Sequence, residues 1–330
     1  MKRTSLGFST LLVASGLALG CGNRGGEGRT SGGLVAGASA GSNKGGGGGG
    51  SGPRLQTIAL PSGYEQPRGI AATNYGAIFV SARESTTQKA VILSLGTGGT
   101  QVVATGDVLG TPGVMTDPVA LAVSQDLMTL YVADLSSAFS PESAGAVLAI
   151  KNGQVSVLSA GSIDAPSGVA IQKDGSLVVS GSDPVTGKGA VFSVAADTGT
   201  ATLLASGGAL TQPTGVGITA NGTIFVTDAG LRLPSAQLLS IGSGAAALVA
   251  KVADTCGAES GVATRGQTVY FAARHAGAGK LSSIQSGAST EQPVVEGSPL
   301  VSPQGVSADA SSVYVADLYA GGTGEIFVLD

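Results

Sequence analysis

The sequence predicts an all-β protein, a six-bladed β-propeller of four-stranded antiparallel blades over residues 55–330. Three observations predict it. One phrase of the sequence returns six times at a nearly constant spacing, the first five units each hold four strand-like segments, and a single spare strand precedes the first unit. A repeat of roughly 40–50 residues that contains four strands is typical of propeller blades.

The repeated phrase is a polar residue or Pro, usually followed by Gly, and then an aliphatic residue and Ala or a similar small residue. It reads "PRGIA" at 67–71 in the first unit and "PSGVA" at 166–170 in the third. The slot held mainly by Gly falls at positions 69, 120, 168, 215, 261 and 305, so the spacing runs from 44 to 51 residues. Such small differences in length indicate that insertions are confined to loops.

Each of the first five units contains four strand signals in a row. In the third unit they are "SGVAIQ", "SLVVSGS", "GAVFSVA" and "ATLLAS". Asp-Gly at 174–175 and Asn-Gly at 221–222 and 152–153 predict tight hairpins with primed turns, because these residues tolerate positive backbone angles. The near-continuous apolar runs favour strands that are packed on both faces between neighbouring blades.

The two ends of the repeat region predict how the ring closes. The sixth unit offers only three strands before the chain stops at Asp330, and the spare strand Leu55–Leu60 precedes the first unit. If the spare strand joins the last blade, the ring closes three-plus-one and the open edges are covered. A two-sheet β-sandwich is the alternative, but it would not predict six copies.

The first 20 residues are predicted to be a secretory signal peptide rather than part of the fold. Lys2 and Arg3 are followed by the apolar run Leu6–Leu19, which is shorter than the roughly 20 residues that a transmembrane helix needs. Residues 21–54 are rich in Gly, show no periodicity and are predicted to be a flexible tether. The tether would reach roughly 30 Å by the scaling for Gly-rich chains.

Gly20-Cys21 resembles the lipobox of bacterial lipoproteins, although Ala18 stands where those motifs usually have leucine. The resemblance implies a lipid on Cys21 and a membrane anchor. With Gly22 after the cysteine, it implies the outer membrane of the bacterial cell envelope. An ordinary signal peptide with an incidental cysteine is the alternative. Cys256 would then be the only free cysteine, and we interpret it as a buried small residue rather than a reactive thiol.

The charge balance excludes one class of partner. Removing residues 1–20 takes away two of the 17 basic residues, which leaves 15 basic and 21 acidic residues. No basic cluster remains in the rest of the chain, so we do not expect a nucleic-acid partner.

The segments "GVAIQKDGSLVVS" (168–180) and "GVGITANGTIFVTD" (215–228) resemble NHL repeats and their relatives in the six-bladed group that includes SMP-30/gluconolactonase and streptogramin lyase. The resemblance covers 55–330. The Gly- and Asn-rich turn and the arginine that follow "YVAD" in NHL repeats are missing here, so the resemblance is to the broad superfamily. The resemblance is a good indicator of the fold and a poor indicator of activity.

Polar residues stand where the second strand of each unit ends, and these ends should converge around one mouth of the central channel. They form a candidate ligand site: Arg83, Asp134, Asp228, Arg274, His275 and Asp317. The carboxylates and arginines could hold a cation or a polar ligand. Alternatively, each aspartate accepts hydrogen bonds from backbone N–H groups of its own loop, which its recurrence with the repeat favours.

The enzyme relatives imply a metal site. SMP-30-like lactonases bind a divalent metal through a glutamate, an asparagine and an aspartate, and the resemblance implies Glu259 with Asp228, Asp317 or Asp134 as ligands for calcium or zinc. No asparagine stands at a matching strand start. A streptogramin-lyase-like reaction would require His275 as its base. The chain has no G-x-S-x-G motif, zinc-type His/Cys spacing or P-loop.

From these observations we expect a monomeric, lipid-anchored binding or scaffolding module of the cell envelope without catalytic activity. Its protein or glycan partner would contact the loops Leu135–Ala144 and Ser182–Lys188. The alternative is a divalent-metal-dependent lactonase or lyase with its site at the channel mouth.

Overall fold

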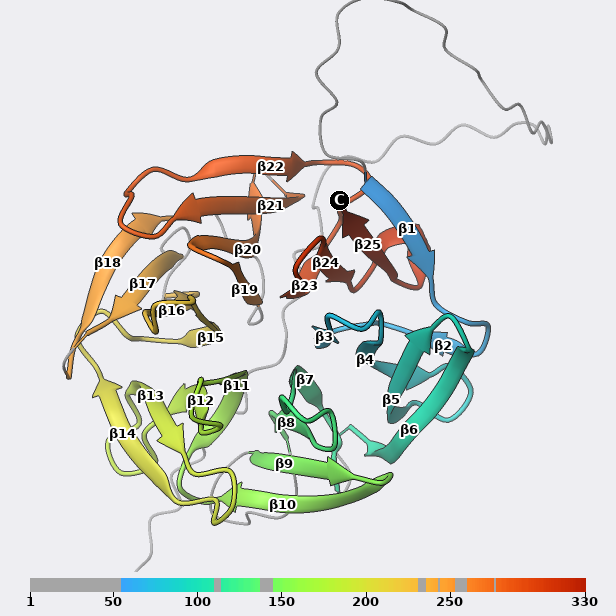
Figure 1. Ribbon diagram of the computed structural model, residues 1–330, viewed down its shortest axis with the longest axis horizontal. Helices are drawn as coiled ribbons and strands as arrows, with labels where there is room; N and C mark the ends of the chain where they lie inside the picture. Colours follow the sequence, from blue (N-terminus) through green and yellow to red (C-terminus); the bar gives the residue numbers. More distant parts are fainter. Residues whose placement is uncertain are drawn as a thin grey trace, which may run out of the picture. The chain divides into compact units, whose positions relative to one another are not determined.

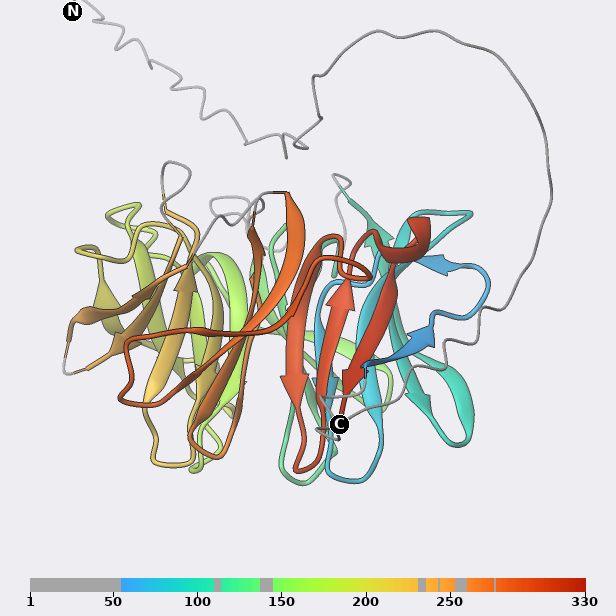
Figure 2. The ribbon, with the colours of Figure 1, turned by 90° about the horizontal axis from the view of Figure 1, so that it is seen from above.

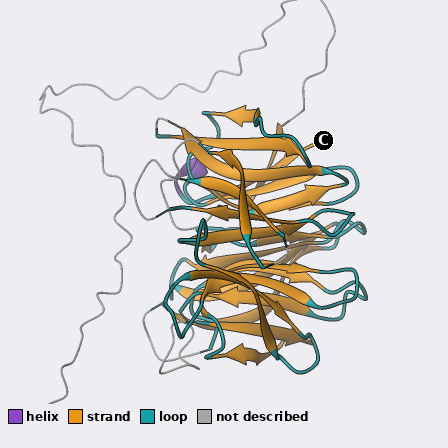
Figure 3. Ribbon diagram, turned by 90° about the vertical axis from the view of Figure 1, so that its left-hand side faces the viewer, coloured by secondary structure: helices purple, strands orange, loops and turns teal. Residues whose placement is uncertain are grey.

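The computed structural model describes residues 55–109, 114–136, 145–230, 236–242, 244–252, 260–275 and 277–330, and every structural statement below concerns these residues. Six antiparallel sheets stand around a central axis as blades (Figure 1), which confirms the predicted fold class. Figure 3 shows that almost every regular element is a strand, with one short 3₁₀ turn, η1 (Ala320–Gly322). None of the described residues forms a helix long and apolar enough to cross a membrane.

Each blade runs from an inner strand beside the axis to an outer strand at the rim. The first three blades are, from inside outward, β3 (Ile70–Ala72), β4 (Ile78–Glu84), β5 (Lys89–Gly96) and β6 (Gly99–Val108); β7 (Pro118–Val123), β8 (Leu130–Asp134), β9 (Ala146–Lys151) and β10 (Gln154–Ala160); and β11 (Asp164–Ile171), β12 (Leu177–Ser182), β13 (Gly189–Val194) and β14 (Ala201–Ser206). A short additional strand, β2 (Tyr64–Glu65), pairs with the end of β4 in blade 1.

The other three blades follow the same order. They are β15 (Pro213–Ile218), β16 (Ile224–Asp228), β17 (Gln237–Ile241) and β18 (Ala246–Lys251); β19 (Val262–Arg265), β20 (Thr268–His275), β21 (Ala278–Gln285) and β22 (Gln292–Glu296); and β23 (Pro303–Ala308), β24 (Val313–Asp317), β25 (Glu325–Leu329) and β1 (Leu55–Ala59).

The ring closes three-plus-one, as predicted. Strand β1 pairs with β25 along its whole length, from Leu55 opposite Leu329 to Ala59 opposite Glu325, and Figure 1 shows it at the rim of blade 6. The carboxylate of Asp330 accepts hydrogen bonds from Gln56 Nε2 and from Ser312 Oγ, both at 2.8 Å. The first described strand and the last residue are thereby joined.

The hydrophobic core lies between the blades rather than inside any one of them. Each cluster of buried side chains combines two neighbouring blades; Val147 of β9 and Val179 of β12, for example, belong to one cluster and are both fully buried. This two-sided burial explains why the strands read as continuous apolar runs rather than as an alternating pattern.

The predicted hairpins all form, but two of the three turns differ from the predicted type. At 151–154 both Asn152 (φ 50°) and Gly153 (φ 75°) are left-handed, as a primed turn requires. At the other two hairpins only Gly175 and Gly222 have positive φ. Gly175 N donates to Gln172 O at 3.0 Å, so the turn precedes the glycine, and the loop is longer than two residues.

The repeated glycine marks the place where neighbouring inner strands approach most closely. A Cβ at Gly215 would lie 2.2 Å from the carbonyl oxygen of Ser260 in the next blade, and one at Gly305 would lie 2.2 Å from the carbonyl oxygen of Arg68. A side chain at these positions would collide with backbone, so the ring can close tightly only with glycine there. In blade 2 this slot holds Ala120.

Candidate functional site

The three aspartates predicted at the channel mouth occupy equivalent positions in alternate blades. Asp134, Asp228 and Asp317 end β8, β16 and β24, and each is the register partner of the proline that begins the inner strand of its blade. All three side chains are buried. We call the side of the propeller on which these strands end the aspartate face; Figure 2 shows the propeller from the side, with loops on both faces.

Asp228 holds the two loops of its own blade corner together. Its carboxylate accepts hydrogen bonds from Thr211 N (2.7 Å), Thr211 Oγ1 (2.6 Å), Gln212 N (3.0 Å) and Gly230 N (2.9 Å). The first three donors precede the inner strand and the last follows the second strand. Both oxygens of the carboxylate are therefore engaged by groups of the corner itself.

Asp317 makes the same kind of corner in blade 6. It accepts hydrogen bonds from four backbone N–H groups, those of Val301 (2.8 Å), Ser302 (3.0 Å), Tyr319 (3.2 Å) and Ala320 (3.0 Å). As in blade 4, the donors come from the loops on both sides of the corner. These two aspartates perform the structural role that the sequence offered as the alternative to ligand binding.

Asp134 is held less completely by the described residues and lies beside other charges. Its oxygens accept hydrogen bonds from Asp117 N (3.2 and 3.3 Å) and from Ser136 N (3.1 Å). Burial raises the pKa of Asp134 to about 7, and the neighbouring carboxylate of Asp117 raises it as well, whereas the amide donors and Arg83 act in the opposite direction.

Arg83 joins blade 1 to blade 2 beside this carboxyl group. Its guanidinium donates to Gln88 O (3.1 Å), Thr116 O (3.2 Å) and Asp117 Oδ1 (3.0 Å), and the residue is only 6% exposed. Arg68 of blade 1 also contacts Asp117 Oδ1. Burial lowers the pKa of Arg83 from its usual value, although Asp117 acts to raise it. Both of its Nη atoms donate to groups within the protein.

The remaining predicted residues are placed as follows. Arg274 Nη2 donates to Gly277 O at 2.8 Å, and its Nε is buried without a partner among the described residues. His275 ends β20, but its side chain lies outside the described residues, as do Glu259 and Cys21. The structure thus brings Arg83 and Asp134 together through Asp117, and it keeps Asp228 and Asp317 in their own corners.

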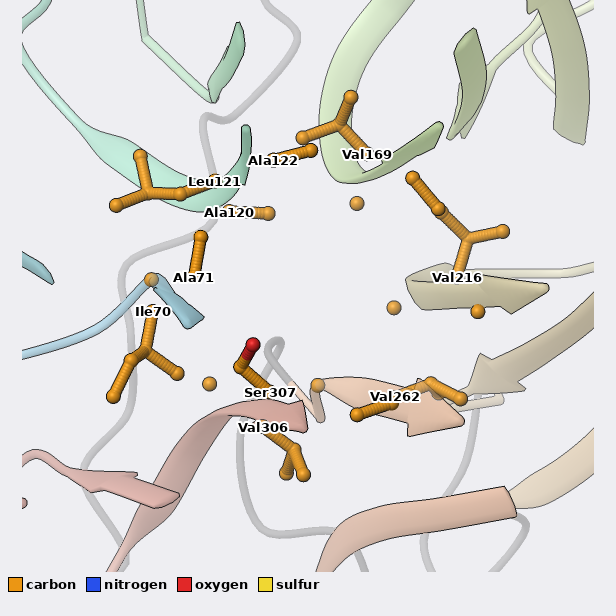
Figure 4. A pocket seen from close by; sticks show the side chains of 18 of the residues that line it. Ile70, Ala71, Ala120, Leu121, Ala122, Val169, Val216, Val262, Val306 and Ser307 are labelled. Atoms are coloured by element: carbon orange, nitrogen blue, oxygen red, sulfur yellow. The ribbon is translucent and has the colours of Figure 1, made fainter. Parts of the chain in front are cut away.

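The central channel is a cavity of about 250 Å³ bounded by the six inner strands (Figure 4). Its wall is backbone, Gly, Ala and larger aliphatic residues, together with five polar residues, Ser167, Thr214, Thr264, Gln304 and Ser307. No ionisable side chain of the described residues contributes to this wall. The predicted arginines and aspartates with described side chains therefore do not line the channel.

Among the polar residues of the wall, Ser307 differs from the others. Its Oγ accepts a hydrogen bond from Ala72 N at 2.9 Å, and no described residue accepts the proton of its hydroxyl. By contrast, Thr264 Oγ1 donates to Ile218 O at 2.5 Å and Ser167 Oγ donates to Pro213 O at 2.7 Å. Sequence reasoning missed Ser307, although aligning the repeats shows a hydroxyl where the other five units have Ala or Gly.

The described residues contain no cluster of the acidic, His or Cys side chains that most often bind a metal ion. No three His, Cys, Asp or Glu side chains gather in a geometry able to hold a metal ion. The oxygens of Asp228 and Asp317 are already directed at backbone N–H groups. A site formed by Asp228 and Asp317 alone does not fit, and the predicted calcium or zinc site stays a prediction that depends on Glu259.

Comparisons with known proteins identify the fold. No protein-family model and no curated protein matches the chain. Among solved structures, the chain is similar to the PQQ-bound aldose sugar dehydrogenase of Streptomyces coelicolor, with 16% identity, a TM-score of 0.62, and coverage of 84% of this chain and 98% of that one. It is similar to a gluconolactonase from Xanthomonas campestris, with 14% identity, a TM-score of 0.58, and coverage of 84% and 89%.

A third similar structure is virginiamycin B lyase from Staphylococcus aureus, with 13% identity, a TM-score of 0.55, and coverage of 84% of this chain and 99% of that one. The fold is that of the gluconolactonases and related six-bladed propellers. At these identities the likeness shows the fold alone, and it is the six-bladed fold that the repeats predicted. The neighbours are named as enzymes of different reactions.

Proposed function

We propose that this protein is a binding module of the bacterial cell envelope that does not itself catalyse a reaction. The observation that carries the proposal is that charged groups on the aspartate face are already engaged in hydrogen bonds and ion pairs within the protein. Asp228 and Asp317 are engaged by backbone N–H groups, Arg83 pairs with Asp117, and no ionisable described side chain reaches the channel. A general acid or base must reach the reacting atom, and none of these groups is placed to do so.

The second candidate is an enzyme, a metal-dependent lactonase or a lyase, and the comparisons favour this class over a non-catalytic module. Similar structures are named as sugar dehydrogenase, gluconolactonase and virginiamycin lyase. For this chain the reaction would depend on Glu259 and His275, whose side chains are outside the described residues. The two candidates therefore differ in whether these two residues are needed.

One experiment separates the candidates. The full chain is treated with a chelator, titrated calorimetrically with Ca²⁺ and with Zn²⁺, and assayed for hydrolysis of five- and six-membered lactones. The binding-module proposal predicts no lactone turnover above that of the buffer, and the same result for Glu259→Gln and His275→Asn. Turnover that requires an added cation and is lost in Glu259→Gln would overturn it in favour of the lactonase.

The proposed partner surface is the loop side of the aspartate face. The described part is the turn at 182–188, where Asp183 accepts hydrogen bonds from Val185 N (2.9 Å) and from Thr186 Oγ1 (2.6 Å). These bonds hold the turn while the Val185 side chain stands 90% exposed. An apolar side chain presented in this way supports a contact with a protein or a glycan, and Val185→Glu would weaken such a contact.

The proposed location depends on Cys21. Acylation of this residue would anchor the chain, and the Gly-rich residues after it would allow the propeller to stand away from the membrane. In cells fed a radiolabelled fatty acid, the wild-type chain should carry the label and sediment with membranes. Cys21→Ser should lose both properties; a variant that stays labelled or membrane-bound would refute the lipid anchor.

A further inference from the structure

The wall of the central channel is polar through its backbone rather than through its side chains. Each of the six inner strands is the terminal strand of its sheet, so it pairs on one side only. In an antiparallel pair, alternate residues direct their N–H and C=O groups toward the partner and the others direct them away. The groups directed away lie at the strand edge beside the channel, and some of them are engaged by the neighbouring blade: Ala72 N donates to Ser307 Oγ and Gly261 N donates to Gln304 O.

The side chains of the wall add almost no further polarity. They are largely Gly, Ala and aliphatic residues. The hydroxyl groups of Ser167, Thr214 and Thr264 donate hydrogen bonds to backbone carbonyl oxygens of neighbouring strands. Ser307 alone, among the hydroxyl residues of the described wall, has a proton without a described acceptor. Figure 4 shows its Oγ directed toward the enclosed space.

This wall discriminates against charge. Moving an ion out of water into a space with no opposite charge is costly, whereas a neutral polar molecule can exchange its bonds to water for bonds to strand edges. The cavity of about 250 Å³ is smaller than a site for a drug-sized ligand. The matching ligand is therefore small, uncharged and able to accept a hydrogen bond.

We propose that the central channel binds a small uncharged molecule with a carbonyl or hydroxyl oxygen, and that Ser307 donates the hydrogen bond that orients it. The inference rests on the proposed binding function and adds to the loop surface a second binding location, with a ligand class of its own. It requires no metal and none of the residues of the aspartate face. The strand edges supply the other hydrogen bonds, and Ser307 supplies a hydroxyl donor.

The test compares two probes of the same carbon skeleton. Isobutyramide and isobutyrate have nearly the same shape but differ in charge, and both are small enough for the cavity. Binding to the full chain is measured by ligand-observed NMR titration up to 100 mM probe at 0.5 M NaCl, where the net negative charge of the protein is screened. We expect saturable binding of isobutyramide and at least roughly tenfold weaker binding of isobutyrate.

Variants show where the probe binds. Ser307→Ala removes the donor and should weaken isobutyramide binding by roughly 2- to 10-fold, the range for one hydrogen bond. Ser307→Leu places a larger group in the space and should abolish binding without changing the melting temperature by more than a few degrees. Ser156→Ala, on the exposed outer strand β10, is the matched control and should leave binding unchanged.

The outcomes separate this inference from the proposed function. No saturable binding of isobutyramide, equal binding of both probes, or binding that survives in Ser307→Leu would each overturn the channel site. None of these results would change the lactone assay, which tests the binding-module proposal. Conversely, metal-dependent turnover lost in Glu259→Gln would overturn the binding module while selective amide binding at Ser307 still stood.

Discussion

Replacing Asp134 by Asn should change how the stability of the propeller depends on pH. Burial raises the pKa of this carboxyl group from 3.8 to about 7 in the folded protein, whereas the unfolded chain exposes it to water. Between about pH 4 and pH 7 the Asp134 carboxyl group is therefore mostly protonated in the folded protein and mostly ionised in the unfolded chain. The contribution of Asp134 to the free energy of unfolding is largest below pH 4 and falls as the pH rises through 7.

The magnitude follows from the size of this shift. A rise from 3.8 to about 7 is about three pKa units, and each unit corresponds to about 1.36 kcal/mol, which gives about 4 kcal/mol as an upper bound. The amide side chain of the Asp134→Asn variant would have no proton to gain or lose, while its carbonyl oxygen could still accept a bond from Asp117 N or Ser136 N. The free energy of unfolding of Asp134→Asn, relative to wild type, should therefore rise by up to this amount between pH 4 and pH 8.

Urea denaturation of both proteins at half-unit steps from pH 4 to pH 8 measures this difference, and a carbon-detected NMR titration follows the Asp134 carboxyl group directly. Asp228→Asn is the matched control. It changes the same kind of corner, and at pH 7 it should destabilise the protein by about 1–3 kcal/mol. The reason is that the new amide NH₂ group, itself a donor, would face the N–H groups that donate to the Asp228 carboxylate in the wild-type protein. If the difference between wild type and Asp134→Asn is the same at every pH, the carboxyl group does not titrate in this range and the reasoning is wrong.

Three further predictions test the fold. Gly215→Ala should destabilise the protein by about 1–3 kcal/mol in urea denaturation, because its Cβ would lie 2.2 Å from a carbonyl oxygen, whereas Gly98→Ala, with nothing within 4 Å, should change stability by less than about 0.5 kcal/mol. Removing β1 (Leu55–Ala59) should expose the edge of blade 6 and give oligomers in gel filtration; a monomer with an unchanged melting temperature would refute the closure. Lys280→Met should cost about 3 kcal/mol because it leaves Glu291 without its partner at 2.6 Å, and adding Glu291→Leu should restore most of the loss.

The repeat predicted the fold because one physical constraint shaped five of the six units. Neighbouring inner strands approach too closely for a side chain at positions such as Gly215 and Gly305, so glycine returned at an even spacing and set the number of blades. The closing strand could be predicted because the sixth unit lacked a fourth strand. Turn type was harder, since Asp-Gly fits both the primed turn and the longer loop that forms around Gly175.

The candidate site could be predicted only in part. The alignment of strand ends placed Asp134, Asp228 and Asp317 correctly at equivalent corners. It gave no sign of Asp117, which lies at the start of the next blade and yet pairs with Arg83, because that contact joins two repeats rather than lying within one. The channel serine was missed for a related reason: a single hydroxyl among small residues stands out only when the six inner strands are aligned.

The alternation of the aspartates around the ring explains why they recur without forming a common site. In blade 1 the second strand continues past the corner and pairs with the preceding segment, with Glu84 opposite Tyr64, and in blade 3 Ser182 pairs with Asp164 in the same way. In blades 2, 4 and 6 the second strand ends at the aspartate, and its carboxylate accepts hydrogen bonds from backbone N–H groups of the corner, where blades 1 and 3 have strand pairing. The aspartate thus accepts hydrogen bonds from backbone N–H groups at a buried corner, where those groups would be costly to leave unpaired. The fold selects an aspartate at this corner whatever the ligand. Residues that depart from the repeat are therefore better candidates for ligand binding, and Ser307, which stands in the channel where the other five units have Ala or Gly, is one of them.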